Sequence, residues 1–303
     1  MPVLIPAILA AGVGAGAWAM RRAIERWAER ESGTRLRAGP DGIVEGAEPI
    51  ALEGSGPNAV LLVHGLGDTP QTLGYLAAWL HERGFTVHAP LLPGHGRSLR
   101  DFAESNAREW LSAVRQEYGA LRDRYARVGL VGLSMGGALA VLLASELDDL
   151  PVLVLLSPYL GVPSPVRWVG RLHPVLGAVF PYVWGRGEKS VKDERERPHS
   201  RAYGYFTPRL LRELTWVADE AGRALPLITA PTLLVQSRDD NRIEPRVAEG
   251  AFERLGAARK RLTWTEGNSH VITVDFGRER VFAMTAEWLG RWMRLPARAA
   301  HHA

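Results

Sequence analysis

Short apolar runs alternate with longer amphipathic stretches along most of the chain from Gly39 onward. Several of these runs are continuously apolar, as is typical of parallel strands buried on both faces. Strands are predicted at Ala59–Val63, Thr86–Ala89, Val128–Leu133, Val152–Leu156, Thr232–Gln236 and Leu262–Thr265. Helices are predicted at Thr72–Arg83, Ala107–Tyr125, Met135–Glu146, Arg246–Leu255 and Arg278–Met293. This alternation predicts an α/β fold with a mostly parallel central sheet flanked by helices.

The alternation breaks once, between Tyr159 and Pro226. This stretch has no clear strand pattern and is rich in proline, glycine, arginine and aromatic residues. Structureless loops of such length are rare inside compact domains. We therefore predict a helical cap insertion at 159–226, folded over one edge of a core formed by 39–158 and 227–295. Residues 296–303 are predicted to form a frayed tail.

The N-terminal stretch Val3–Met20 carries no charge and is followed at once by arginines. As a helix it would span about 27 Å, close to the roughly 30 Å hydrocarbon thickness of a bilayer. We predict an apolar helix and a basic linker over residues 1–38, acting as a membrane anchor, a surface-lying helix or a cleaved signal peptide. The arginines favour membrane association through residues 3–20 with the bulk of the chain on the cytoplasmic side, and export is the alternative.

Charge and composition exclude several classes of function. Of the net charge of +4, residues 21–37 contribute +3, from six arginines and three glutamates. Nucleic-acid recognition needs cations gathered on a binding face, so we predict no nucleic-acid partner. The chain has no cysteine, which excludes disulfides, thiolate nucleophiles and cysteine-based zinc sites. No H-E-x-x-H or similar ligand spacing occurs, so neither a metal nor a cofactor is expected.

Candidate chemistry begins at Gly132-Leu133-Ser134-Met135-Gly136, between the predicted strand Val128–Leu133 and a predicted helix. This is a G-x-S-x-G nucleophile elbow in its strand–turn–helix setting. The turn is so tight that glycine is needed at 132 and 136, and Ser134 is pushed into the open. Ser134 also sits at a helix N-terminus, which favours negative charge on a bound carbonyl oxygen. We predict Ser134 as the nucleophile.

A serine hydroxyl needs a base to take its proton and a carboxylate to orient that base. Among the nine histidines, His270 alone lies beyond the final predicted strand and before the C-terminal helix. Asp239 and Asp240 follow the strand Thr232–Gln236, and local reasoning does not choose between them. The order serine, aspartate, histidine is that of the α/β-hydrolase triad.

A third element, His64-Gly65-Leu66-Gly67, follows the strand Ala59–Val63 directly. Acyl transfer passes through an oxyanion, which two backbone N–H donors stabilise by roughly 3 to 4 kcal/mol each. We assign these donors to Leu66 and Met135. His64 is expected to order its loop by hydrogen bonds rather than to transfer a proton.

Four blocks in order carry a family resemblance: HGLGDTP from 64, GLSMGGALAV from 132, QSRDDNRIEP from 236 and HVITVD from 270. They resemble the α/β-hydrolase superfamily and, within it, bacterial monoacylglycerol lipases and small carboxylesterases. The resemblance implies that Asp240, not Asp239, is the triad acid, and that Leu66 and Met135 are the oxyanion donors. It also implies ester hydrolysis without a cofactor, beneath a small mobile cap.

These observations predict a serine ester hydrolase with the catalytic residues Ser134, Asp240 and His270. Its partner is a small-molecule acyl ester, with monoacylglycerols and short to medium chain esters placed first; no oligomeric state is predicted. The same site also suits thioester cleavage, acyl transfer or peptide cleavage after an N-terminal residue. An aminopeptidase would need cap carboxylates to hold the substrate ammonium, and the candidates are Glu188, Asp193, Glu194 and Glu196. A non-catalytic hydrolase-like binding protein is the remaining alternative.

Overall fold

The computed structural model describes residues 4–185 and 190–294, with side chains from Gly16 onward. At its centre lies a seven-stranded sheet in the order β1-β3-β2-β4-β5-β8-β9. The strands are β1 (Ile50–Leu52), β2 (Asn58–Val63), β3 (Thr86–Ala89), β4 (Arg127–Leu133), β5 (Leu153–Leu156), β8 (Thr232–Ser237) and β9 (Lys260–Thr265). All pairs are parallel except β1 with β3. The prediction of a mostly parallel α/β sheet is confirmed, and each of the six predicted strands is present.

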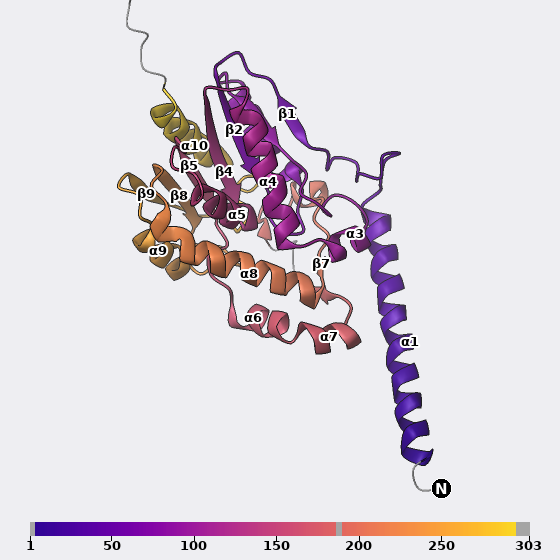
Figure 1. Ribbon diagram of the computed structural model, residues 1–303. Helices are drawn as coiled ribbons and strands as arrows, with labels where there is room; N and C mark the ends of the chain where they lie inside the picture. The colour runs from indigo at the N-terminus through magenta and orange to yellow at the C-terminus, as the bar shows by residue number, and fades with distance from the viewer. Residues whose placement is uncertain (1–3, 186–189, 295–303) are drawn as a thin grey trace, which may run out of the picture.

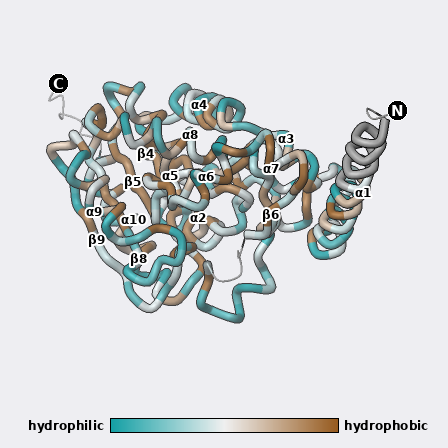
Figure 2. The backbone as a smooth tube through the Cα atoms, turned by 90° about the horizontal axis from the view of Figure 1, so that it is seen from below, coloured by the Kyte–Doolittle hydropathy of each residue, from teal (hydrophilic) through white to brown (hydrophobic). Residues whose placement is uncertain are grey.

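Helices cover both faces of the sheet (Figure 1). On one face lie α4 (Ala107–Arg122), α5 (Met135–Ala144) and α9 (Pro245–Arg254), whose buried side chains share one apolar core with inward residues of the strands. On the other face, α2 (Gly74–His81) and α10 (Arg278–Trp292) close a second core. The residues of α5 are buried all round, as expected of a helix between the sheet and a further layer. Figure 2 shows apolar positions concentrated at this centre.

Outside the stretch between β5 and β8, three short elements were not predicted from the sequence. The edge strand β1 has only three residues, too few for a periodic signal. The predicted helix Thr72–Arg83 begins instead with the 3-10 turn η1 (Pro70–Leu73) before α2. Helix α3 (Leu99–Glu104) is one and a half turns long, and a reciprocal capping box between Ser98 and Asp101 defines its start.

The stretch between β5 and β8 is mainly helical, as predicted. It contains α6 (Ser164–Arg171), α7 (His173–Val179), β6 (Val183–Trp184), the 3-10 turn η3 (Arg197–His199), β7 (Tyr205–Phe206), α8 (Pro208–Ala224) and the 3-10 turn η4 (Leu225–Leu227). The two-residue strands β6 and β7 pair antiparallel, a feature too short to predict. The apolar side of α8 packs on α5, and α6 and α7 pack on α8 in turn. The predicted bounds of the cap, 159–226, stay a prediction.

The N-terminal helix α1 (Leu4–Arg35) runs well beyond the predicted apolar stretch and includes five of the six arginines at 21–37. Ion pairs at helical spacing, Arg21 with Glu25 and Arg35 with Glu31, support this extension. The helix stands at one side of the molecule, beside α3 and α7 (Figures 1 and 2). Across the described residues, no helix combines the length and apolar character needed to cross a bilayer. Of the predicted apolar stretch at residues 3–20, side chains are described only from residue 16 onward.

Some predictions fall outside the described residues. These are the start of the N-terminal stretch at residues 1–3, the cap carboxylate Glu188 and the tail 296–303.

Candidate active site

Four loops that carry the predicted site residues leave the sheet at the same edge. Leu66 follows β2, Ser134 follows β4, Asp240 follows β8 and His270 follows β9. Because these strands are parallel, their carboxyl ends meet at one edge of the sheet. Strand order places β4 directly beside β2 and within two strands of β8. The topology therefore brings together residues that are far apart in the sequence.

Ser134 lies in a strained turn between β4 and α5. Its backbone has φ 55° and ψ −120°, a conformation that costs a non-glycine residue about 1–3 kcal/mol. A Cβ at Gly132 would lie 2.3 Å from the carbonyl oxygen of Gly136, and one at Gly136 would lie 2.1 Å from that of Val63. Only glycine fits at these two positions, which is the steric reason for the G-x-S-x-G pattern. The turn presents the serine hydroxyl beyond the end of the strand.

Ser134, His270 and Asp240 form one hydrogen-bonded chain. Nε2 of His270 lies 2.8 Å from Oγ of Ser134. Nδ1 of the same ring lies 2.8 Å and 3.0 Å from the two carboxylate oxygens of Asp240. With a proton on Nδ1, the ring donates to the carboxylate and leaves Nε2 free to accept the serine proton. This is the geometry that turns an alcohol into a nucleophile.

The surroundings of Asp240 keep its carboxylate ionised. Its side chain is fully buried, and burial by itself would raise its pKa. The neighbouring His270 and the backbone N–H groups of Arg242 and Ile243, at 2.7 and 3.0 Å, outweigh burial and hold the pKa below its usual value. Gln236 donates a further bond of 2.7 Å from its amide nitrogen. An aspartate held in this way stays negative and orients the imidazole.

Asp239 has a different environment. Its exposed carboxylate accepts from Nζ of Lys192 at 2.9 Å and from the backbone N–H of Gly267 at 3.0 Å, and these bonds lower its pKa. It has no hydrogen bond to His270. Of the two adjacent aspartates that the sequence offered, the structure joins Asp240 to the imidazole.

The Gly65-Leu66 turn lies directly against the serine. A Cβ at Gly65 would be 3.2 Å from Cβ of Ser134, so the β2 loop and the elbow are in contact. Met135 opens α5, where the first N–H groups of the helix have no carbonyl partner within the helix. Within the described part of the chain, no acceptor takes the N–H of Leu66 or of Met135. The two amides are thus free to bind an oxygen beside Ser134.

His64 orders this loop, as predicted. Its ring is fully buried, with Nδ1 at 2.9 Å from the carbonyl oxygen of Gly65 and Nε2 accepting from the N–H of Leu92 at 3.1 Å. Burial lowers its pKa to about 4, so the ring is neutral at physiological pH. Both nitrogens are engaged inside the protein, which leaves neither for substrate.

Comparisons with known proteins agree with this geometry. A family model described as "Serine aminopeptidase, S33" matches residues 56–276. The chain belongs to this family. The S33 family match covers every residue of the predicted triad and both candidate oxyanion donors. It therefore confirms the resemblance to the α/β-hydrolases that the four sequence blocks carry.

Individual relatives of this S33 chain are similar over most of its length. The thermostable monoacylglycerol lipase of Bacillus sp. (strain H-257) is 27% identical, covering 82% of this chain and 96% of that protein. The carboxylesterase of Bacillus subtilis (strain 168) is 28% identical, covering 80% and 96%. A solved structure from work on two metagenome-derived lipolytic enzymes, LipS and LipT, is 28% identical with a TM-score of 0.77, covering 84% of this chain and all of that one. These likenesses confirm the α/β-hydrolase fold.

The structure adds three residues to the site of this S33 family member that sequence reasoning did not assign: Gln236, Asp68 and Asp275. Gln236 and Asp275 lie within the blocks QSRDDNRIEP and HVITVD, which are the signal that pointed to them. Asp68, in the block HGLGDTP, is buried two residues beyond Leu66. Burial raises the pKa of Asp68 to about 6, against the opposing hydrogen bond from the N–H of Thr69.

The cap carboxylates predicted for an aminopeptidase are engaged with arginines. Asp193 pairs with Arg195 at 2.9 Å, and Glu194 pairs with Arg197 at 3.2 Å. Glu196 is held by Arg278 at 2.6 Å. Each described carboxylate among these candidates is therefore paired with an arginine, from the same stretch or from α10.

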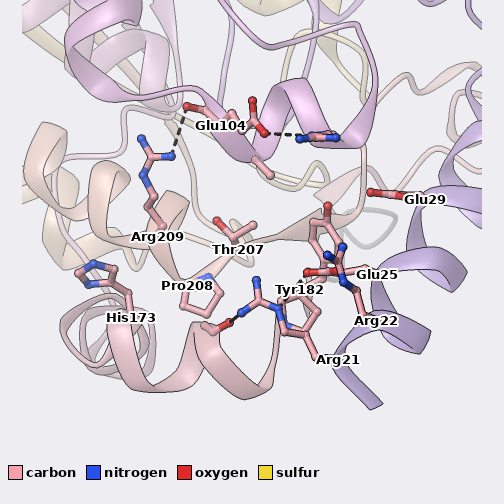
Figure 3. Close-up of a pocket in the computed structure, with 14 residues that line it drawn as sticks. Arg21, Arg22, Glu25, Glu29, Glu104, His173, Tyr182, Thr207, Pro208 and Arg209 are labelled. Carbon is pink, nitrogen blue, oxygen red and sulfur yellow. Dashed lines mark hydrogen bonds and ion pairs between the residues drawn. The ribbon is translucent and has the colours of Figure 1, made fainter. Parts of the chain in front are cut away.

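A polar pocket of about 500 Å³ lies apart from the triad, between α1, α3, α7 and the start of α8. Figure 3 shows its lining, in which Arg21 reaches from α1 to the carbonyl oxygen of Gly177 and Arg209 reaches that of Glu104. Tyr182 forms part of the same wall. The lining is charged and internally bonded, so it does not suit an acyl chain.

Proposed function

We propose that the protein is a serine ester hydrolase that cleaves carboxylic esters through an acyl-enzyme on Ser134. The hydroxyl of Ser134 attacks the ester carbonyl carbon while Nε2 of His270 takes its proton. The N–H groups of Leu66 and Met135 bind the oxyanion that forms. Collapse of the intermediate breaks the C–O bond, and His270 protonates the leaving alcohol. Water, deprotonated by His270, then releases the carboxylic acid and restores the serine.

A single observation carries this proposal: the continuous hydrogen-bonded chain from Ser134 through His270 to Asp240. It stands beside two amides with open N–H groups on adjoining loops. A non-catalytic binding protein would need neither the hydrogen-bonded chain nor the open N–H groups. The relatives named monoacylglycerol lipase and carboxylesterase support the choice of an ester as substrate.

For the acyl group, we propose short to medium chains, with monoacylglycerols first. Aromatic rings lie against the oxyanion loop: a Cβ at Gly67 would be 2.9 Å from the ring of Phe206 and 3.3 Å from that of Phe102. Phe206 comes from β7 in the insertion and Phe102 from α3. Phe102 is fully buried, whereas Phe206 is partly exposed and offers an apolar surface beside the loop that would hold the ester carbonyl, which favours a hydrocarbon chain over a polar group.

A fluorophosphonate probe and a substrate series test the proposal. The probe should label the wild-type protein and fail to label Ser134→Ala. Hydrolysis should rise from acetate to medium-chain nitrophenyl esters, and monoacylglycerols should be cleaved. Absence of labelling would reject an enzyme of this kind, and a preference for the shortest ester over all others would reject the lipid substrate.

Peptide cleavage is a second candidate because the matching family model is described as a serine aminopeptidase. Such an enzyme must hold a substrate ammonium with a carboxylate near Ser134. Asp193, Glu194 and Glu196 are each paired with an arginine, which disfavours that role. Aminoacyl nitroanilides assayed beside the nitrophenyl esters distinguish the two: faster turnover of the anilides would replace the ester proposal.

We also propose that the protein associates with a phospholipid surface through α1 and the helices α6 and α7. Large apolar side chains are exposed on these elements and on β6: Trp18, Met20, Trp27, Trp168, Leu172, Val175, Val179, Phe180 and Trp184. Arg21 ties α1 to α7 through the carbonyl oxygen of Gly177 at 2.8 Å. Arg22 lies over Trp18 and Arg171 over Trp168, so cations accompany the aromatics, as suits an anionic headgroup layer. The cytoplasmic placement stays a prediction.

Vesicle sedimentation tests this surface. The full chain should sediment more with phosphatidylglycerol vesicles than with phosphatidylcholine vesicles. A Trp168→Ser/Val175→Ser double variant should sediment less, while Leu227→Ser, which alters an exposed leucine on η4, should sediment like wild type. Equal sedimentation of all three proteins would reject the surface.

A further inference from the structure

Asp275 binds four backbone N–H groups from two separate segments. Its side chain is almost fully buried. Oδ1 accepts from Asp193 and Phe276, both at 2.9 Å, and Oδ2 accepts from Lys192 at 2.9 Å and Ser269 at 2.7 Å. A carboxylate has about four lone-pair sites, so its acceptor capacity is filled. Two of these donors lie in the insertion and two in the loop of His270.

These bonds control the backbone on both sides of His270. The N–H before it, of Ser269, is bound by Asp275 directly. The N–H after it, of Val271, donates to the carbonyl oxygen of Ser190 at 3.0 Å. Ser190 begins a segment, Ser190–Arg197, that we call the strap; Asp275 fixes its path through Lys192 and Asp193. The carboxylate of Asp275 therefore binds the N–H of Ser269 directly. It also holds the strap, whose Ser190 accepts from the N–H of Val271.

The strap also reaches the loop of the triad acid. The hydroxyl of Ser190 accepts from Nε of Arg242 at 2.9 Å, two residues beyond Asp240. Nζ of Lys192 pairs with Asp239 at 2.9 Å, one residue before it. The loops of the catalytic acid and base are thus tied to the same stretch of the insertion.

Further along, Glu196 anchors the strap to the core. Its carboxylate pairs with Arg278 of α10 at 2.6 Å and accepts from the hydroxyl of Tyr75 of α2 at 3.3 Å. The strap is therefore fixed near both ends, at Ser190 and at Glu196. Asp275 binds it between these two points.

We propose that Asp275 is a positioning residue for His270, acting through the strap. It fixes the imidazole by holding the backbone on either side of it, and it couples the conformation of the insertion to the alignment of the triad. This inference rests on the proposed function, because the aligned imidazole matters only if Ser134 is the nucleophile.

The test replaces Asp275 with asparagine. An amide presents one oxygen and one NH₂ group, so it can accept from only one of the two donor pairs and turns hydrogens toward the other. The imidazole should lose its fixed position, and a displacement of about 1 Å lowers kcat by about 10²-fold. We expect KM to stay near the wild-type value, because substrate contacts are unchanged. The rate of fluorophosphonate labelling should fall in parallel with kcat.

Hydrogen exchange gives a readout that does not depend on catalysis. In Asp275→Asn, the amides of Ser269 and Val271 should exchange faster, while those of β4 should not change. The matched control is Asp219→Asn, which removes a carboxylate of α8 paired with Arg167. That variant should keep wild-type kcat and wild-type exchange at 269–271.

A second variant tests the inference if Asp275→Asn does not fold. Ser190→Ala/Lys192→Met removes both side-chain links between the strap and the acid loop without altering a buried charge, and should lower kcat several-fold with KM unchanged. A folded Asp275→Asn protein with wild-type kcat and exchange overturns the inference. If Asp275→Asn does not fold, wild-type kcat in the double variant overturns it. If the wild-type protein neither labels nor cleaves esters, the proposed function fails, and exchange at 269–271 still decides whether Asp275 holds the loop.

Discussion

Nε2 of His270 lies 2.8 Å from Oγ of Ser134, although 136 positions separate the two residues in the chain. The contact depends on the parallel sheet, which brings the ends of β4 and β9 to the same edge. Ser134→Ala and His270→Ala should therefore each lower kcat greatly, by up to about 10⁶-fold as in comparable triads. Their double variant should be no worse than either alone, since the residues act as one unit. Additive losses measured by steady-state kinetics would contradict this.

The adjacent aspartates should respond very differently to loss of charge. Asp240→Asn keeps the shape of the side chain but removes the acceptor that sets the imidazole tautomer, so kcat should fall by about 10⁴-fold. Asp239→Asn removes the charge of an exposed carboxylate that pairs with Lys192, and keeps an oxygen that can accept from the N–H of Gly267, so it should have a much smaller effect. Kinetics of the two variants on one nitrophenyl ester give the comparison. A larger loss of kcat in Asp239→Asn than in Asp240→Asn would identify Asp239 as the triad acid.

The elbow glycines should tolerate no side chain. In Gly136→Ala, the new Cβ would meet the carbonyl of Val63 at 2.1 Å, so we expect insoluble or strongly destabilised protein without activity. Gly250 offers a matched control inside α9, because a Cβ there meets nothing within 4 Å. Gly250→Ala should raise stability by about 0.5–1 kcal/mol through its effect on helix formation. Thermal denaturation and soluble yield measure both.

Asp68 should make stability depend on pH in a predictable direction. Its pKa of about 6 in the folded protein exceeds the value of 3.8 for a free side chain. Between these values the folded state binds a proton that the unfolded state releases, so stability falls as pH rises through this window. Above pH 6 the buried charge lowers stability by up to about 3 kcal/mol.

Asp68→Asn removes that charge and keeps an acceptor for the N–H of Thr69. The variant should be more stable than wild type at pH 8, and the difference should vanish below about pH 3.8. Urea denaturation across this range provides the measurement. A difference that is constant with pH would show that the carboxylate is not the titrating group.

Much of the fold could be predicted because its signals are local. Buried parallel strands such as β4 appear in the sequence as continuous apolar runs, and a long helix such as α4 shows its apolar spacing over more than three turns. The small elements could not be predicted, because β1, β6 and β7 contain too few residues for a period to show. Helix α1 exceeded its prediction because ion pairs between charged residues, together with the buried Ala28, support its second half.

The candidate site divides in the same way. Ser134 and His270 could be chosen from motif and order along the chain, whereas the choice between Asp239 and Asp240 needed either the family resemblance or the three-dimensional contacts. Asp275 lies in the block HVITVD, but its role could not be assigned from local sequence. Its partners, Lys192 and Asp193, lie more than 80 positions away in a segment without periodicity, so their meeting is a property of the tertiary fold.

The strap is attached to the loops of both Asp240 and His270, so the insertion has two parts that differ in how well they should tolerate substitution. The helices α6 and α7 form no hydrogen bond to the base loop or to the acid loop within the described chain, so exchange of that portion for one from a relative would leave the bonds of both triad loops in place. Residues 190–197 cannot be exchanged in the same way. A foreign sequence at these positions would also replace the contacts that hold the backbone around His270. Chimeras intended to shift selectivity should therefore join the foreign sequence before Ser190.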